Sequence, residues 1–528
     1  MGRERNRLTA SESCHHEVEL RLVGEPEALK TAFNACLTTP GPLEGETTSS
    51  LESSYFDTAD HRLREQGLAL RIRKKGKEHK QTLKSGDDAQ ALLLSRGEWE
   101  APLSDDQPSL DKLPEEARSL VRKATGKRKL RRLFTTRFER RVCQLVSNAP
   151  NEPVSRIEAA LDLGEIKTEA GALPVAELEL ELLEGPPHSL YRIAKELHGS
   201  LPLRLETRSK SSRAYHHIAD EPPPWQRASS TPLSLSTSVD DAMMVIFKSC
   251  FDQWLANQAA AMDGRDPEGV HQMRVGIRRL RSALSVFQGL IPASQLEWLR
   301  PAARMAIQSL SSTRDWDVFQ SDILAPVLVA RPHDKPLIAL NRKVNTRRLS
   351  SYRAMRKGLS GRDYNNAMLS IGEWLERRSW QIGRDAKQEK RANKPIADFA
   401  SHLLDKRHRK ATTRGAGFAD LPVAARHDVR ILLKKLRYAA EFFAPLFKKK
   451  SVKPYLDSLK ALQDDLGHLN DLAVAETLLN ELTLSTGKRD IGGAAGMVIG
   501  WHERGVASLE PELIQNWQAF TDHPPFWK

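Results

Sequence analysis

Two periodicities divide this chain. Up to about Ile218, short runs such as HEVELRL, LALRIR and AELELELL alternate between apolar and polar residues and are separated by Gly, Pro, Ser or Asp. A period of two is typical of β-strands. Beyond Val239 the apolar residues recur at steps of three and four, as in IRRLRSALSVFQGL, which is typical of amphipathic helices. The pattern predicts an antiparallel β domain followed by an all-α domain.

A segment rich in Pro and Ser separates the two patterns. Residues 219–238, ADEPPPWQRASSTPLSLSTS, lack a regular apolar repeat and are typical of an interdomain linker. A chain of 528 residues is also too long for one hydrophobic core. The predicted domains are therefore residues 14–218 and residues 239–524, and the fold class is α+β multidomain.

Several of the predicted strands carry a charge at every second position. These charges are Glu17, Glu19 and Arg21, then Arg71 and Arg73, then Glu177, Glu179 and Glu181. Alternate side chains lie on one side of a strand. For a single strand, a charged face is equally well explained by a solvated outer surface. Because some runs are acidic and others basic, a barrel with a charged interior explains the whole set better.

The helical half contains an internal repeat with a basic stripe. The segments HQMRVGIRRLRSALSVF and HDVRILLKKLRYAAEFF carry His, Arg or Lys at the same offsets, namely at His271, Arg274, Arg278 and Arg281 and at His427, Arg430, Lys434 and Arg437. These offsets place each set along one helix face. A single basic helix face is usually just solvated. Here four stacked cations repel one another without an intervening acid, so the repeat predicts a bound polyanion.

The net charge becomes informative when it is counted separately for the two halves of the chain. The chain carries +13, yet the first 240 residues hold 36 Lys and Arg against 37 Asp and Glu, and the rest hold 45 against 31. The basic excess of the helical half attracts nucleic acid, anionic membranes or polyphosphate alike. No run approaches the roughly 18 apolar residues of a membrane span, the N-terminus lacks an apolar signal core, and the four cysteines show no CxxC spacing. We expect a cytoplasmic protein without a disulfide framework.

The helical half resembles a known family. From about Asp240 to Pro524 it is similar to the conserved histidine α-helical domain (CHAD), both in the two basic helices and in the RD and ND segments that follow them, with Asp315, Asp317 and Asp471. The resemblance implies a pair of four-helix bundles related by pseudo-symmetry. It also implies that the eight residues of the two stripes bind polyphosphate, without catalysis. The acids of the following segments are expected to anchor the basic side chains from behind.

The first domain resembles a second family. HEVELRL is similar to the ExExK signature of the CYTH, or triphosphate tunnel metalloenzyme, family, and the resemblance covers about His16 to Ile218. It implies an eight-stranded antiparallel tunnel barrel with flanking helices that encloses a triphosphate and divalent cations. Carboxylates suit Mg²⁺ or Mn²⁺, and Arg and Lys suit phosphate, so the site interleaves them.

The second resemblance assigns roles to individual residues. The implied metal ligands are Glu17, Glu19, Asp162, Glu177 and Glu179. The implied substrate-binding residues are Arg71, Arg73, Lys84, Arg140, Lys210 and Arg213, and the catalytic set is Glu17, Glu19, Arg21 and Lys84. Glu98 and Glu100 fit a supporting acidic strand. The pattern leaves open whether Arg137 or Arg140 faces the tunnel.

One position departs from the family signature. Its third residue is usually Lys, and here it is Arg21. Arg keeps the charge but presents a planar fork, so the exchange is not neutral at a tight site. Rate or preferred substrate length is the property we expect it to alter.

The sequence thus predicts a metal-dependent hydrolase of inorganic tripolyphosphate or short-chain polyphosphate, using Mg²⁺ or Mn²⁺. The helical domain would bind long-chain polyphosphate, including polyphosphate granules, with no membrane partner. Three alternatives stay open: a non-catalytic granule-binding protein, a thiamine triphosphatase and an adenylate cyclase on the same barrel. Aromatic residues are only 6% of the chain and absent from the stripes, so we expect no specific nucleic-acid binding.

Overall fold

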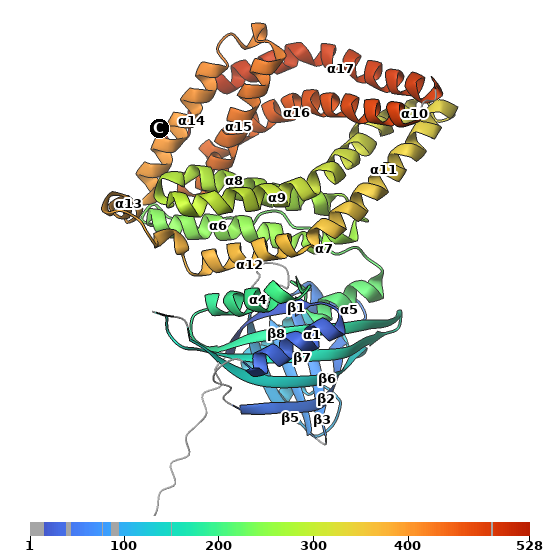
Figure 1. Ribbon diagram of the computed structural model, residues 1–528, viewed down its shortest axis with the longest axis vertical. Coiled ribbons are helices and arrows are strands. Elements are labelled where there is room, and N and C mark those ends of the chain that lie inside the picture. Colours follow the sequence, from blue (N-terminus) through green and yellow to red (C-terminus); the bar gives the residue numbers. More distant parts are fainter. Residues whose placement is uncertain are drawn as a thin grey trace, which may run out of the picture. The chain divides into compact units, whose positions relative to one another are not determined.

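The chain forms two compact units (Figure 1). The computed structural model describes residues 15–38, 44–76, 78–85, 94–148, 150, 152–486 and 489–528. The first unit comprises Met1–Pro223 and Asn365–Arg377, and the second comprises Pro224–Tyr364 and Arg378–Lys528. The segment Asn365–Arg377, which the apolar pattern alone assigned to the helical domain, therefore groups with the first unit.

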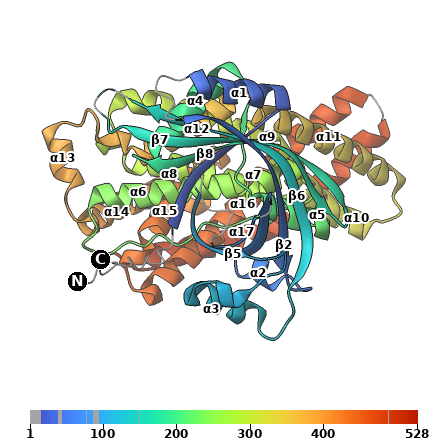
Figure 2. The same cartoon turned by 90° about the horizontal axis from the view of Figure 1, so that it is seen from below.

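The first unit is built on a closed antiparallel sheet, whose curvature Figure 2 shows. Its strands are β1 (His15–Val23), β2 (Glu44–Asp57), β3 (Leu68–Lys75), β4 (Glu78–Ser85), β5 (Leu94–Leu103), β6 (Arg131–Ser147), β7 (Ser155–Thr168), β8 (Gly171–Glu184) and β9 (Arg204–Leu205). The strand order is β5-β4-β3-β2-β6-β7-β8-β1-β9, and β1 also pairs with β5. The described sheet has nine strands where eight were predicted, because a two-residue strand is too short to show a period in the sequence. Without β9, the remaining eight form the closed ring.

Helices flank this sheet. They are α1 (Pro26–Thr38), α2 (Arg62–Glu65), α3 (Glu115–Thr125), α4 (His188–Ser200) and α5 (Lys210–Ala219). Most of α12 (Arg362–Glu376) also belongs to this unit and contacts α4, where Lys195 pairs with Glu373. One apolar core forms where Leu70, Leu83 and Trp99 of the sheet pack with Val121 of α3. Alternation along the strands turns these apolar side chains to one face and the charged ones to the other.

Helix α5 is tied to the sheet by a buried hydrogen bond. Ser209 caps its N-terminus by accepting from Ser212 N at 3.0 Å. Tyr215 Oη donates to Asp57 Oδ2 at 2.9 Å, and Asp57 is fully buried and also accepts from the backbone N–H groups of α2. This bond fixes the rotation of α5 and therefore the direction of the basic side chains at its start.

The regular secondary structure in the described residues of the second unit is helical apart from one isolated β-bridge between Ser238 and Pro395, which confirms the all-α prediction. Its helices are α6 (Val239–Ala256), α7 (Gln258–Asp263), α8 (Glu268–Val286), α9 (Ala293–Val318), α10 (Ala325–Ala330), α11 (Lys335–Leu359), α13 (Ala386–Ala392), α14 (Ile396–Arg414), α15 (Val423–Phe443), α16 (Lys449–Thr486) and α17 (Arg489–Asp522). Neighbouring helices pack together within two consecutive sets. The first set is α6, α8, α9 and α11, and the second is α14 to α17. The two sets meet where α8 packs against α15. Among the described helices, none is both long and apolar enough to cross a membrane.

Candidate functional sites

The strand register brings charged residues of the first unit face to face. Arg21 of β1 lies opposite Glu179 of β8, and Glu177 of β8 lies opposite Asp162 of β7. Asp162 in turn lies opposite Arg140 of β6. Residues directly opposite across an antiparallel pair point to the same side of the sheet. The register thus places these five charges on one wall.

Three carboxylates on this wall form a compact acidic cluster. Asp162, Glu177 and Glu179 each offer an oxygen within 4.8 Å of the others, and the first two are fully buried. Lys210 from α5 pairs with all three, with Nζ lying 2.8 Å from Asp162 Oδ2 and 2.9 Å from Glu179 Oε1. Buried carboxylates in this number are stable only when cations or a metal compensate them.

Three arginines complete the network around the cluster. Arg140 donates to Asp162 through Nε at 2.7 Å and Nη2 at 2.6 Å, and Nη2 also reaches Glu179 Oε2 at 2.5 Å. Arg21 donates through Nη2 to Glu19 and through Nε to Glu179 Oε1 at 3.3 Å. The third arginine, Arg213 of α5, donates to Glu177. Eight of the predicted site residues, including Arg21 and the buried Glu19, therefore meet in one interior network.

Electrostatics keep this network ionised. Burial alone would raise the pKa of Glu179, but Lys210, Arg140 and Arg21 hold that pKa well below its usual range. Burial likewise opposes the charge of Lys210, yet Asp162, Glu177 and Glu179 raise its pKa above the usual value. Ionised carboxylate oxygens are the ligands that Mg²⁺ and Mn²⁺ prefer. The donor set of the cluster therefore fits a hard divalent cation.

A basic group lies on β3 and β4 of the same sheet. Glu98 of β5 pairs with Arg71 at 3.4 Å and with Lys84 at 3.3 Å. Arg73 donates to Ser53 Oγ at 3.4 Å. The positive charge of Arg71, burial and the charge of Arg140 together lower the pKa of Arg73 to about 10. Cations crowded to this degree are stabilised by a bound anion.

The register also shows two acids, Glu158 and Glu181, that the sequence analysis did not assign as ligands. Glu19 lies opposite Glu181, and Glu181 lies opposite Glu158 of β7, so all three form a further acidic row on the same wall. The alternating acids in AELELELL and RIEAALDL were the sequence signal that could have identified Glu181 and Glu158. The side chain of Glu17 lies outside the described side chains, although its backbone belongs to β1.

Exposure answers the open question about Arg137 and Arg140 and also shows where Glu100 lies. Arg137 is 53% exposed and pairs with Glu52 at 3.1 Å on the outside of the sheet, whereas Arg140 belongs to the interior network. Glu100 is 43% exposed and pairs with Lys80 at 2.9 Å, so it lies at the rim.

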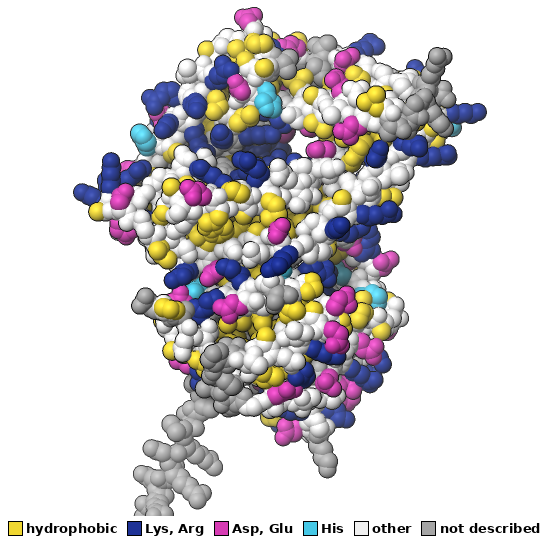
Figure 3. Space-filling model, viewed as in Figure 1, with side chains coloured by type: hydrophobic (Ala, Val, Ile, Leu, Met, Phe, Trp, Pro, Cys, Tyr) yellow, Lys and Arg dark blue, Asp and Glu magenta, His cyan; other side chains and the backbone are white. Residues whose placement is uncertain are grey.

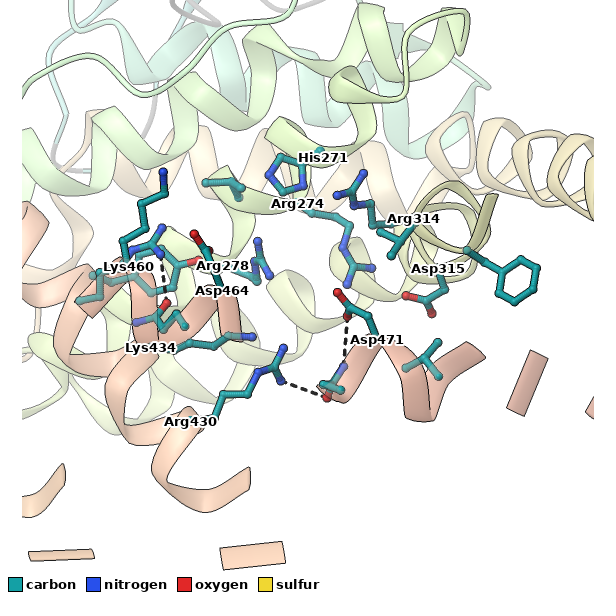
Figure 4. A pocket seen from close by; sticks show the side chains of 18 of the residues that line it. His271, Arg274, Arg278, Arg314, Asp315, Arg430, Lys434, Lys460, Asp464 and Asp471 are labelled. Carbon is teal, nitrogen blue, oxygen red and sulfur yellow. Dashed lines mark hydrogen bonds between the residues drawn. The ribbon is translucent and has the colours of Figure 1, made fainter. Parts of the chain in front are cut away.

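The second unit contains a basic cavity of about 610 Å³ between α8, α9, α15 and α16 (Figure 4). Figure 3 shows Lys and Arg side chains gathered in a hollow of the helical half. The polar lining residues are His271, Arg274, Arg278, Arg314, Asp315, Arg430, Lys434, Arg437, Tyr438, Lys460, Gln463, Asp464, Asn470 and Asp471. Six of the eight predicted polyphosphate-binding residues thus line one cavity.

The remaining two stripe residues lie elsewhere. Arg281 and His427 are exposed and do not line the cavity. Ten residues of helix extend about 15 Å, so a stripe of that length runs beyond the lining of this cavity. Arg281 lies at the C-terminal end of its stripe and His427 at the N-terminal end of the other, so each helix contributes its remaining three stripe residues to the cavity.

Charge and unmet hydrogen bonding characterise the cavity. Seven Lys and Arg face three Asp in its lining. Arg274 Nη1, Arg278 Nε and Arg430 Nε are buried without a hydrogen-bond partner among the described residues. Burial and then Arg314, Arg278 and Arg274 lower the pKa of His271 to about 4, so this histidine is neutral near pH 7. Buried donors that lack acceptors fit an anionic ligand with many oxygens.

The acids near the stripes serve different purposes. Asp315 and Asp471 line the cavity. Asp317 instead accepts from Arg348 at 2.6 Å and from Tyr352 at 2.9 Å, so it holds α11 against α9 and does not anchor the stripe. Sequence reasoning also missed lining residues, among them Arg314, Lys460 and Gln463. Arg314 was readable beside Asp315, whereas Lys460 and Gln463 of α16 gave no signal.

Family models identify both units. Residues 15–215 match the CYTH domain and residues 245–480 match the CHAD domain. The chain therefore belongs to the proteins that carry a CYTH domain followed by a CHAD domain.

Individual relatives share parts of the chain. It is 28% identical over 166 residues to the inorganic triphosphatase of Haemophilus influenzae, and the match covers 31% of this chain and 45% of that protein. The crystal structure of the CHAD domain from Ricinus communis shares 28% identity over 57% of this chain and 97% of that chain, with a TM-score of 0.49. A structure from Pyrococcus horikoshii shares 16% identity over 37% of this chain and 94% of that chain, with a TM-score of 0.23.

Proposed function

We propose that the CYTH domain hydrolyses a phosphoanhydride bond of inorganic tripolyphosphate or short-chain polyphosphate with Mg²⁺ or Mn²⁺, and that the CHAD domain binds longer polyphosphate in its cavity. One observation carries the first part: an acidic cluster suited to a hard cation and a crowd of cations suited to phosphate face the interior of one closed sheet. The similarity to an inorganic triphosphatase supports the same reaction class.

The interior residues divide the work between cation and phosphate. Asp162, Glu177 and Glu179 would hold the divalent cation. The resemblance to the CYTH family adds Glu17 and Glu19 to this proposed ligand set. A cation held there would neutralise phosphate charge and acidify water. Phosphoryl transfer depends on positioning and charge compensation, so a side-chain nucleophile is not required.

The basic side chains bind and orient the substrate. Arg71, Arg73 and Lys84 offer donors to the phosphate oxygens from one part of the sheet. Lys210 and Arg213 do so from α5, whose rotation the Tyr215 to Asp57 hydrogen bond fixes. Bringing these charges to one place before substrate arrives avoids reorganisation during the reaction.

The cavity of the CHAD domain carries the second part of the proposal. Its four helices direct seven Lys and Arg side chains into one space. Three of their guanidinium nitrogens have no hydrogen-bond acceptor among the described residues. The lining contains two aromatic side chains, Phe319 and Tyr438, against seven Lys and Arg, so charge outweighs the surface available for base stacking. Phosphate contacts without base contacts favour polyphosphate over a nucleic acid sequence.

Comparing three substrates tests the assignment against its alternatives. Phosphate release is measured with the full chain from tripolyphosphate, ATP and thiamine triphosphate, each with Mg²⁺ or Mn²⁺. We expect tripolyphosphate to give the fastest release. Faster release from ATP or thiamine triphosphate would contradict the substrate assignment, and no release from any of the three would favour a non-catalytic granule-binding protein.

Replacing Arg21 by Lys should leave an active enzyme. Arg21 contacts both Glu19 and Glu179, and Lys keeps the charge but provides fewer fixed donors. We expect the rate of tripolyphosphate hydrolysis to change by less than about tenfold. Steady-state kinetics of the variant decide this, and complete inactivation would show that the guanidinium is specifically required.

Polyphosphate affinity should fall as the pH rises above about 8. Burial and then Arg430 and Arg278 lower the pKa of Lys434 to about 8. A bound polyanion raises that pKa, so above pH 8 binding must also take up a proton, whereas below pH 8 the amine is already charged. One such proton weakens affinity by at most about tenfold per pH unit. Titrations between pH 7 and 9 should show this decline, and Lys434→Arg, which stays charged, should remove it.

A further inference from the structure

Lys434 occupies an unusual position in the basic cavity. It lies on α15 one helical turn from both Arg430 and Arg437, and all three side chains line the cavity. Arg278 of α8 lines the same cavity, and Figure 4 shows the amine of Lys434 between the labelled guanidinium groups. The next residue, Lys435, is exposed and does not line the cavity. The two adjacent lysines therefore differ in environment while sharing one backbone.

We propose that Lys434 is an acylation site that takes its acyl group from an acyl phosphate bound in the cavity. The arginines hold the phosphate of the donor, which places its carbonyl carbon beside Nζ. The neutral amine attacks that carbon, the bond between the carbonyl carbon and the phosphate oxygen breaks, orthophosphate leaves, and the nitrogen loses one proton to solvent. The product is an Nε-acyl lysine.

Two features of the cavity favour this reaction. Arg274 Nη1, Arg278 Nε and Arg430 Nε are buried without hydrogen-bond partners among the described residues, so a small acyl phosphate finds donors already in place. Before any anion binds, burial and then Arg430 and Arg278 lower the pKa of Lys434 to about 8, so part of the amine is already neutral when an acyl phosphate arrives. Asp471 opposes this effect, and Arg437 adds to it.

Acylation would also act on the proposed polyphosphate binding, and this consequence alone rests on that function. The modification removes one of the seven cations of the lining and adds bulk to a cavity of about 610 Å³. Polyphosphate in turn would cover Lys434 and protect it. The extent of acylation at Lys434 would then depend on the relative concentrations of the acyl phosphate and polyphosphate.

The test compares the two adjacent lysines within one protein. The full chain is incubated with acetyl phosphate near pH 7.5, and acetylation of Lys434 and Lys435 is followed by peptide mass spectrometry. We expect Lys434 to react about tenfold faster than Lys435, because only Lys434 lines the cavity whose arginines would hold the reagent beside its amine. Equal rates, or a slower rate at Lys434, would overturn the proposal.

Two controls separate anchoring from amine reactivity and from polyphosphate binding. Arg278→Gln should slow acetylation of Lys434 by acetyl phosphate more than by a neutral acetyl ester, and an equal effect on both reagents would contradict the phosphate anchor. Polyphosphate affinity is measured separately by calorimetry. If polyphosphate fails to bind while Lys434 still reacts preferentially with acetyl phosphate, the acylation site stands and the proposed polyphosphate function fails.

Discussion

Replacing Glu179 by Gln should lower the rate of tripolyphosphate hydrolysis at least about 100-fold, which is the effect of losing one essential electrostatic contributor. Gln keeps the shape of the side chain but removes the charge that the cation requires. Glu179 also contacts Arg21, Arg140 and Lys210, so its neutral replacement leaves three cations less compensated. The rate is measured with saturating Mg²⁺ or Mn²⁺, so that weaker metal binding is separated from lost turnover.

A matched substitution outside the barrel controls for a general loss of charge. Glu52 pairs with Arg137 on the outer face, and both side chains are exposed. Glu52→Gln should leave the rate unchanged, and both variants should retain the far-ultraviolet circular dichroism of the parent. Asp162→Asn provides a second interior variant with the same expected loss. Parental activity in both interior variants would contradict the site.

Reversing two charges in the cavity should weaken polyphosphate binding at least about 100-fold, because two attractive contacts become repulsive. The variant carries Arg274→Glu and Arg278→Glu, which change two lining residues of α8. Binding is measured by calorimetry with long-chain polyphosphate at near-physiological salt. Affinity should also decrease with added salt, as for other polyanion binders.

The chain offers a control with the same change in net charge. Arg281 of α8 and Lys435 of α15 are exposed and lie outside the cavity. Arg281→Glu with Lys435→Glu should reduce polyphosphate affinity far less than the cavity variant. Equal losses in both variants, or equal affinity of the parent for polyphosphate and for DNA of similar charge, would reduce the cavity to a generic basic surface.

The sequence predicted the architecture because each half has one dominant period. Alternation in the first half and helical spacing in the second determine which residues share a face, and that is why Glu177 and Glu179 were assigned to one wall. Register is not encoded in such a pattern. The row that joins Glu19 to Glu181 became visible only when β1 and β8 were paired.

The sequence pattern also failed to predict which residues from distant helices line the cavity. Lys460 enters the cavity from α16, and no feature of its own helix distinguishes it from an ordinary surface lysine. The opposite error arose for Arg281 and His427, whose spacing matches the stripe although the cavity ends before them. Helical spacing gives direction around an axis, but only the packing of neighbouring helices determines how far along that axis a cavity extends.

The most direct measurement is the conversion of tripolyphosphate by the full chain, followed by phosphorus NMR with Mg²⁺ or Mn²⁺ and again after addition of a chelator. A metal-dependent hydrolase should convert tripolyphosphate to pyrophosphate and orthophosphate in equal initial amounts, and chelation should stop the reaction. Tripolyphosphate that stays intact with either metal, or hydrolysis that continues unchanged after chelation, would contradict the account.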